Sequence, residues 1–400
     1  MYSVVSHELL KDAISALLRY CQRDNWAGYD PYDALNSRVF ARIPFLQNKL
    51  GKLAFTQLMK RSPVNLRQLM LVPKSHNPKG LALFASALMK LHEVGLMGNK
   101  DDALSPLDLM IKLKDPKNPY YSWGYNFDWQ SRLRFIPKGV PNIICTTFAG
   151  NALLDAYEKY GNSHYMEMAE SAGRFLLEGL NISWEKEGLC FSYTPLDWGR
   201  IHNANLLGAA YLARLHQLTG KERYLKHAIP AARYSVGKQN ADGSWYYGEG
   251  GTQQWIDNFH TGYNLVALNN ICKYTGVDDF RSNIERGYDY YEKHFFTEEG
   301  IAKYFHNKIY PIDIHSITQS IVTLVELKEY GKKSIALALN VCCWALQNMR
   351  SPQGFFYYQK TRYLKIKIPY MRWSQGWMLY GLAKLAPNIV RESVSKSNCQ

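Results

Sequence analysis

The sequence predicts an all-α protein, an (α/α)6 barrel in which six helical hairpins close into a ring with short β-hairpins at its mouth. Two repeated patterns carry this prediction. Ala- and Leu-rich helical segments end 66, 59, 56, 55 and 57 positions apart, at Gly95, Gly161, Gly220, Gly276, Gly331 and Asn388. Turn residues recur 55, 57 and 54 positions apart, at Gly188, Gly243, Gly300 and Gly354. Two independent registers share one period, which is typical of a repeat architecture.

Each repeat has an inner helix, a short turn, an outer helix and a hairpin-like loop that leads to the next inner helix. The inner segments are apolar on all sides, as expected at the centre of a ring, whereas the outer segments are amphipathic. A Gly or Asn at the end of each inner helix suits a left-handed C-cap. The period exceeds the about 33–47 residues of common open solenoids, which favours a closed ring. The helix expected at residues 6–21 would be the outer partner of the last inner helix.

The chain is therefore expected to form one structural domain with three segments. Residues 1–75 should hold N-terminal helices and loops that join the barrel, residues 76–390 the barrel, and residues 391–400 a flexible tail. A chain of 400 residues is long enough to build one large core.

The composition indicates an ordered protein that attracts anions. Hydrophobic residues make up 46% and charged residues 20%, which excludes disordered and fibrous classes. Lys and Arg outnumber Asp and Glu by 48 to 34, and the 29 Tyr and 10 Trp offer flat faces for stacking on sugars. Seven scattered cysteines, no signal-peptide pattern and no apolar run of about 18 residues predict a cytoplasmic protein without a membrane span.

The loops that lead into the inner helices open on one face of such a ring, where we expect the functional residues. Histidines recur there 19, 18, 16 and 16 residues before the helix-ending glycines, at His76, His202, His260 and His315. Acidic residues precede three of them, at Asp197, Asp257 and Asp313. Helix N-capping would also explain an Asp in these places, so capping and catalysis both stay open. Four histidines in one register favour a functional cleft over simple packing.

Other chemistries lack their sequence patterns. No H-x-x-x-H or H-E-x-x-H pair supports a zinc site, no G-K-[ST] follows the glycines of residues 248–251, and no G-x-S-x-G elbow marks a serine nucleophile. The sequence therefore predicts no metal and no organic cofactor. Its basic residues are scattered and no segment is typical of a groove-binding helix, so nucleic acid is not an expected partner.

Two segments carry a resemblance to a known superfamily: residues 201–225, IHNANLLGAAYLARLHQLTGKERYL, and residues 258–276, NFHTGYNLVALNNICKYTG. They resemble the six-hairpin glycosidase-like (α/α)6 toroids, which include unsaturated glucuronyl hydrolases, N-acylglucosamine epimerases, polysaccharide lyases and glucuronyl C5-epimerases. The chain also resembles uncharacterised proteins of bacterial exopolysaccharide gene clusters. The resemblance covers residues 76–388 and implies the toroid, while hydrolysis, elimination and epimerisation all occur on this ring.

The residues at the mouth suit proton abstraction from an acidic sugar in exopolysaccharide metabolism. A C5-epimerase or lyase must neutralise the sugar carboxylate and remove the neighbouring proton by general base catalysis. His260 or Tyr263 is the expected base, and His315 the assisting group. The carboxylate would be held by Arg200 and Asn203. Further catalytic candidates are Asp257, Asp313 and His202, and further substrate-binding candidates are Trp198, Trp245, Tyr247, Gln254, Arg372, Trp373, Asp128 and Trp129.

Three alternatives stay open on the same ring. A glycoside hydrolase needs two carboxylates across the sugar, and the candidates are Asp30, Asp33, Asp128, Asp197, Glu249, Asp257 and Asp313. A non-catalytic protein would hold a glycan as a scaffold. A terpenoid cyclase or prenyltransferase is a minor alternative, because residues 238–248, KQNADGSWYYG, are similar to the repeats of those enzymes but occur once. The expected partner is an acidic glycan, and the basic surface leaves contact with an anionic membrane or a lipid-linked glycan open.

Overall fold

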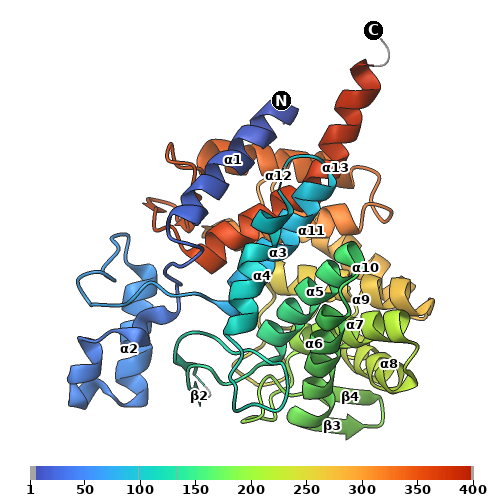
Figure 1. Ribbon diagram of the computed structural model, residues 1–400, viewed down its shortest axis with the longest axis horizontal. Coiled ribbons are helices and arrows are strands. Elements are labelled where there is room, and N and C mark those ends of the chain that lie inside the picture. Colours follow the sequence, from blue (N-terminus) through green and yellow to red (C-terminus); the bar gives the residue numbers. More distant parts are fainter. Residues whose placement is uncertain (1–5, 98, 133, 398–400) are drawn as a thin grey trace.

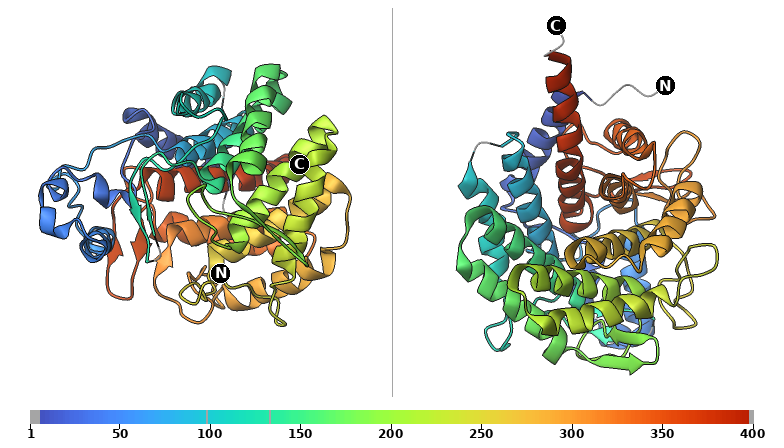
Figure 2. Two further views of the ribbon diagram at one scale, coloured as in Figure 1. Left: turned by 90° about the horizontal axis from the view of Figure 1, so that it is seen from below. Right: turned by 90° about the vertical axis from the view of Figure 1, so that its right-hand side faces the viewer.

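The computed structural model describes residues 6–97, 99–132 and 134–397, with side chains as far as Ile389, and confirms the predicted all-α ring. Six inner helices surround its centre: α3 (Pro78–Glu93), α5 (Ile143–Tyr160), α7 (His202–Thr219), α9 (Asn258–Thr275), α11 (Ile314–Glu326) and α13 (Trp377–Ser397). Each packs against the next, and α13 packs against both α11 and α3, which closes the ring. Figure 2 shows the hairpins succeeding one another around the molecule.

The outer helices form a second layer: α4 (Lys100–Lys112), α6 (Ser163–Arg174), α8 (Glu222–Val236), α10 (Arg281–His294), α12 (Ser334–Asn348) and α1 (His7–Arg23). Helix α1 packs against α13, so the first and last described helices form the sixth hairpin, as expected. The outer helices bury one stripe each; in α8 the buried residues include Tyr224, Ala228, Ala231 and Ser235. None of the described helices is both long and apolar enough to cross a bilayer.

Some of the inner helices end at the repeated glycines predicted from the sequence, and others do not. Helices α5, α7 and α9 end in a left-handed conformation, with φ between 68° and 72°, at Gly161, Gly220 and Gly276. Helix α11 ends earlier, at Glu326, ahead of Gly331. Helix α13 continues past Asn388 to Ser397, so the expected flexible tail begins within a helix, and residues 398–400 lie outside the described residues.

Short strands and turns link the hairpins. Antiparallel pairs are formed by β1 (Trp129–Gln130) with β2 (Phe135–Ile136) and by β3 (Ile182–Glu185) with β4 (Gly188–Phe191). A three-stranded antiparallel sheet contains β5 (Ile312–Asp313), β6 (Gln359–Lys360) and β7 (Lys365–Ile366). Asp313 pairs with Gln359 there, which holds the start of α11 against the loop before α13. The short helical turns are η1 (Asp33–Asn36), η2 (Phe40–Arg42), η3 (Pro44–Leu46), η4 (Phe175–Gly179) and η5 (Met371–Gly376).

The core lies between the two layers of helices and inside the inner ring. Helix α7 is buried on nearly every side between His202 and Leu215. Helices α5 and α7 approach closely at Gly150, where a Cβ atom would lie 2.4 Å from the phenol of Tyr211. That phenol donates a hydrogen bond to the Ala169 carbonyl over 2.6 Å, so the one buried polar atom of this contact is satisfied.

An arm, residues 38–71, projects from the barrel and carries helix α2 (Lys49–Arg61), as Figure 1 shows. The arm is fixed at its base because Arg67 Nε donates to Asp33 Oδ1 over 2.6 Å, with both side chains buried. Within the arm, the rings of Phe40 and Phe55 stack with centroids 4.2 Å apart. These contacts hold α2 in one position relative to the barrel.

Candidate active site at the mouth of the barrel

A cavity of about 550 Å³ opens where the inner helices begin. All six hairpins contribute to it, through Lys79, Ile144, Asn203, His260, His315 and Trp373. Aromatic residues form most of its wall: Tyr32, Tyr125, Phe127, Trp129, Tyr193, Tyr247, Trp255, Phe259, Tyr263, Tyr304, Phe305 and Trp373. Its described lining also holds five basic side chains, Arg61, Lys79, Arg132, Arg134 and Arg372, and a single carboxylate, Asp257. Two of the basic side chains, Arg134 and Arg372, pair with Asp197 and Asp30 outside the lining, and the other three have no carboxylate partner in the described chain. The cavity therefore favours a ligand that carries negative charge and flat apolar faces.

His260 and Asp257 form an oriented dyad at the start of α9. Asp257 is the N-cap residue, and its Oδ1 accepts from the His260 backbone N–H over 3.0 Å. Its Oδ2 accepts from His260 Nδ1 over 2.7 Å and from Trp255 Nε1 over 2.8 Å. Because Nδ1 carries the proton that Asp257 accepts, the lone pair of His260 is on Nε2, as a general base requires. The carboxylate of Asp257 thus both caps helix α9 and orients the imidazole of His260.

His315 and Tyr263 form a second pair beside the first. Tyr263 Oη and His315 Nε2 are 2.6 Å apart, and the imidazole of His315 is stacked between Phe259 and Trp377 with centroids 4.5 Å from each. Burial, together with the cationic Lys79, lowers the pKa of His315 well below 6.5, so its imidazole is neutral at neutral pH. Burial raises the pKa of Tyr263 well above 10, so its phenol keeps its proton. The pair is therefore suited to proton donation.

Asp313 lies behind the cavity wall. It caps α11 by accepting from the His315 backbone N–H over 2.8 Å, and it also accepts from Trp373 Nε1 over 2.9 Å and Gln359 Nε2 over 3.0 Å. Burial raises its pKa to about 6. Its three hydrogen bonds hold His315 and Trp373 in place, and Asp313 itself does not line the cavity.

Lys79, in the first turn of α3, is the cavity residue that sequence reasoning missed most clearly. Its ammonium lies 4.2 Å from the ring centroid of Phe148, 5.1 Å from that of Trp377 and 5.3 Å from that of Tyr263. No carboxylate in the described chain forms an ion pair with it. Burial and the nearby Arg372 lower its pKa to about 7. Lys79 is therefore a buried amine of the cavity lining that has no anionic partner in the described chain.

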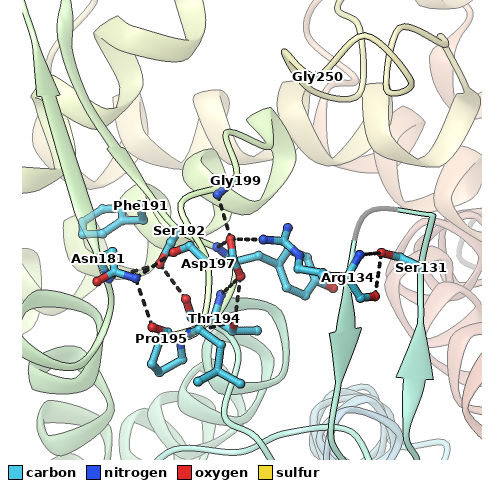
Figure 3. A network of polar contacts seen from close by, with 12 residues as sticks. Ser131, Arg134, Asn181, Phe191, Ser192, Thr194, Pro195, Asp197, Gly199 and Gly250 are labelled. Atoms are coloured by element: carbon cyan, nitrogen blue, oxygen red, sulfur yellow. Dashed lines mark hydrogen bonds and ion pairs between the residues drawn. The ribbon is translucent and has the colours of Figure 1, made fainter. Parts of the chain in front are cut away.

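Arg134 is held over the cavity by a network built around Asp197 (Figure 3). Asp197 Oδ1 forms an ion pair with Arg134 Nη1 over 2.6 Å. The same carboxylate accepts from the backbone N–H groups of Thr194 and Gly199, both over 2.8 Å. Asn181 Nδ2 donates to the Asp197 carbonyl over 2.7 Å, which ties the loop to the β3–β4 hairpin. Asp197 thus positions a cavity arginine from the loop that precedes α7.

The structure brings together nine of the candidate residues predicted from the sequence. The cavity lining contains His260, Tyr263, His315, Asp257, Asn203, Tyr247, Arg372, Trp373 and Trp129. Tyr247 stacks on Trp255 at 4.5 Å and lies against the imidazole of His260 at the same separation. The buried Oδ1 of Asn203 has no hydrogen-bond partner among the described residues, so it is free to accept from a ligand.

The other candidates lie outside the cavity lining. Arg200 forms ion pairs with Glu185 and Glu249 instead, because β3 brings Glu185 beside it and the loop between α8 and α9 brings Glu249. His202 is buried within the ring, and burial lowers its pKa to about 4. Trp245 is a core residue whose Nε1 donates to the Ser235 carbonyl over 2.9 Å. The remaining residues of this group are the exposed Trp198 and Gln254, and Asp128, which accepts from the Lys138 backbone N–H.

A second cavity, of about 600 Å³, opens at the opposite end of the ring. Its charged residues largely neutralise one another: Arg214 pairs with Asp155 and Glu158, and Lys384 pairs with Glu326. No group of three or more potential metal ligands occurs at either end or elsewhere in the described chain. The side chains suited to acid–base catalysis, His260, Tyr263 and His315, line the cavity where the inner helices begin. That cavity is therefore the candidate active site.

Comparison with known proteins agrees with this architecture. No protein-family model and no curated sequence matches the chain. Among solved structures, the Lin0763 protein of Listeria innocua matches with a TM-score of 0.62, 13% identity, and coverage of 96% of this chain and 98% of that one. Cellobiose 2-epimerase of Bacillus thermoamylovorans matches with a TM-score of 0.59, 12% identity, and 77% and 87% coverage. A family 76 α-mannanase of Bacteroides thetaiotaomicron matches with a TM-score of 0.59, 13% identity, and 80% and 86% coverage.

The chain has the fold of the six-hairpin glycosidase-like toroids. These likenesses confirm the predicted (α/α)6 ring as a fold. Of these three structures, two have names that state an activity on a carbohydrate: the epimerase and the mannanase. In this six-hairpin toroid, the candidate active site occupies the end of the ring at which the inner helices start.

Proposed function

We propose that the chain is a carbohydrate-active enzyme that removes the proton next to the carboxylate of a uronate-containing glycan, as a C5-epimerase or a lyase. The observation that carries the proposal is the His260–Asp257 dyad, which faces a cationic, aromatic cavity beside the Tyr263–His315 pair. An oriented imidazole is a general base, and the buried phenol of Tyr263 beside it, with ring centroids 6.2 Å apart, is a general acid. The carbohydrate activities named for two solved relatives of the same fold support the substrate class.

In the proposed reaction, His260 Nε2 takes the C5 proton and the electron pair moves into the sugar carboxylate, which becomes an enediolate. Lys79 and Arg372 stabilise the charge that develops there. Tyr263 then donates its proton, with the N–H of His315 stabilising the phenolate. If the proton goes to the opposite face of C5, the product is the epimer. If it goes to the oxygen leaving C4, that bond breaks and a C4–C5 double bond forms.

Hydrolysis with paired carboxylates has less support at this site. That mechanism needs two carboxyl groups across the glycosidic bond, one as acid and one as base or nucleophile. In the described lining, Asp257 is the single carboxylate, and its oxygens already accept from His260 and Trp255. Asp313 and Asp197 are occupied by their own hydrogen bonds behind the wall. The site therefore favours proton abstraction over hydrolysis.

The proposed setting is the exopolysaccharide metabolism of the cytoplasm. Free thiols occur at Cys21, Cys145, Cys190, Cys272 and Cys342, which supports a reducing compartment. The aromatic wall supports a sugar substrate, because pyranose rings stack on such faces.

Proton NMR in heavy water tests the proposal. We expect the purified protein to exchange the C5 proton of a uronate-containing polysaccharide in a panel that includes neutral polysaccharides. The His260→Ala variant should lose this exchange, while His164→Ala, which alters an exposed histidine on α6, should keep it. New reducing ends without C5 exchange would overturn the proposal in favour of hydrolysis. Binding without any turnover would overturn it in favour of a glycan-binding scaffold.

A further inference from the structure

The arm, residues 38–71, is a cationic surface without acidic residues. The sequence contains no Asp or Glu between residues 34 and 92. The arm's basic residues are Arg38, Arg42, Lys49, Lys52, Lys60, Arg61 and Arg67. Only Arg67 forms an ion pair within the described chain, with the buried Asp33. Six cationic side chains of the arm are therefore free of carboxylate partners, and four of them, Arg38, Arg42, Lys49 and Arg61, are exposed.

The same arm exposes large apolar side chains to solvent. Six of them show between 54% and 77% of their surface: Phe45, Leu50, Leu58, Val64, Leu69 and Leu71. On α2, Leu50, Ala54 and Leu58 are four residues apart and all exposed, so they form a stripe along one face of the helix. Lys49 and Arg61 stand at the two ends of this stripe. An apolar helix face edged by cations and pointing into water requires an explanation.

The position of this surface is fixed relative to the active-site cavity. Leu53, Gln57 and Arg61 on α2 line the cavity, while Leu50 and Leu58 on the same helix point to solvent. Lys60 Nζ lies 4.3 Å from the ring centroid of Tyr32 and 6.0 Å from that of Trp373, both of which are cavity residues. Whatever covers the outer face of the arm therefore lies next to the cavity mouth.

We propose that the arm docks the protein on an anionic lipid bilayer, with the cavity mouth held at the membrane surface. A helix with a cationic rim and exposed Leu and Phe side chains binds in the interfacial plane: its apolar face enters the headgroup boundary and its cations pair with lipid phosphates. The charge pattern selects this occupant. A second copy of the arm would oppose the four exposed cations, Arg38, Arg42, Lys49 and Arg61, to the same four cations of its partner. A polyanion such as RNA would leave the leucines in water.

This docking gives the cavity access to sugars attached to membrane lipids. The arm surface carries the docking inference independently of the reaction, and vesicle binding needs no sugar. Failure of the C5 exchange experiment would therefore not contradict the membrane docking. Failure of vesicle binding would likewise not contradict the proposed reaction.

Co-sedimentation with vesicles tests the docking. We expect the full chain to bind phosphatidylcholine–phosphatidylglycerol vesicles much more strongly than pure phosphatidylcholine vesicles, and to be released as salt rises. The Arg42→Glu/Lys49→Glu variant should bind about tenfold or more weakly. Its matched control is Lys186→Glu/Lys226→Glu, with the same change of net charge at two lysines far from the arm, and it should bind like the wild type. The Leu50→Ser/Leu58→Ser variant should also bind weakly, against Leu113→Ser as the apolar control.

Circular dichroism and sedimentation velocity accompany each variant. Because Leu50 and Leu58 are exposed, their substitution should leave the helical signal unchanged. Equal binding to both vesicle types, or equal binding by the arm variants and their controls, would overturn the proposal. Concentration-dependent self-association that the Leu50→Ser/Leu58→Ser variant abolishes, without vesicle binding by the wild type, would assign the surface to a second copy of the chain.

Discussion

Arg372 and Asp30 form a buried bidentate ion pair: Arg372 Nε and Nη2 donate to the two carboxylate oxygens of Asp30 over 2.7 and 2.8 Å. The pair joins the turn before the last inner helix to the N-terminal segment. The backbone N–H of Asp30 in turn donates to Asp33 Oδ2 over 2.8 Å, and Asp33 receives Arg67 from the arm. The carboxylates of Asp30 and Asp33 therefore link Arg372, which lines the cavity, to Arg67 of the arm.

We expect the Asp30→Asn variant to lose about 3–5 kcal/mol of unfolding free energy, because Arg372 would remain charged and buried without its partner. Burial lowers the pKa of Arg372 and the charge of Asp30 more than offsets this, so the pKa is raised in the native protein. Without Asp30 the guanidinium still keeps its proton, because arginine does not deprotonate in proteins. Chemical denaturation measures this loss. The control is Asp12→Asn, which breaks an exposed pair with Arg350 and should cost less than about 1 kcal/mol. Similar losses in the two variants would contradict the importance of the buried pair.

Lys79→Met should remove a pH dependence of stability. The pKa of Lys79 is lowered from 10.5 to about 7 in the folded protein, so between these values the unfolded chain binds a proton that the folded chain does not. The contribution of Lys79 to the free energy of unfolding therefore rises with pH between about 7 and 10.5, by at most about 1.4 kcal/mol per pH unit. Denaturation at several pH values should show a smaller slope in Lys79→Met than in wild type. The exposed Lys226→Met is the control, and an unchanged slope in Lys79→Met would argue that the ammonium is solvated or paired.

The same Lys79→Met variant should lose activity on uronates while keeping or gaining stability. The buried cation destabilises the empty protein, and its proposed role is to stabilise negative charge on the bound sugar. We expect a loss of about 10²-fold or more in kcat/KM, with partial recovery in Lys79→Arg. Steady-state rates on the C5-exchange substrate measure this. Full activity in Lys79→Met would remove Lys79 from the proposed site.

Tyr263→Phe should separate the two proton transfers. His260 still removes the C5 proton in this variant, so exchange with heavy water should continue, whereas formation of the epimer or the unsaturated product should fall by about 10²–10⁴-fold. The matched change is Tyr211→Phe, at a buried tyrosine of α7 whose phenol bonds only to the Ala169 carbonyl among the described residues. Parallel loss of exchange and product in Tyr263→Phe would make Tyr263 the base instead of His260.

Asp257→Asn should lower activity more than stability. The amide still accepts from the His260 backbone N–H as a helix cap, but it cannot hold the Nδ1 proton of His260 as a carboxylate does. We expect a loss of about 1 kcal/mol in unfolding free energy and a fall of 10²-fold or more in rate, read by denaturation and C5 exchange. A rate that falls only as far as the folded fraction falls would limit Asp257 to capping.

Periodicity predicts the ring because six repeats must all bury an inner helix, and no local feature overrides that pattern. His260 and His315 are found for the same reason, since each occupies the first turn of an inner helix. Lys79 is missed because a lysine at a helix start ordinarily faces water, and only the closed ring buries it. Arg134 and Tyr125 are missed although Trp129 of the same loop is found, because the sequence does not reveal which side chains of the loop before α5 face the cavity. Arg200 is expected at the cavity from its closeness to His202, but Glu185, from a hairpin whose register the sequence does not reveal, pairs with it instead.

The pairing of α1 with α13 has a consequence for how the chain folds. The sixth hairpin joins segments at opposite ends of the described sequence, and it is further connected by the contact between Arg350 and Asp12, 338 residues apart. Five hairpins can form from neighbouring segments, but ring closure requires one contact of very long sequence separation and is expected to be slow. A circular permutant that links α13 directly to α1 and opens the chain between two other hairpins would make this contact local. Its refolding should be faster at equal stability.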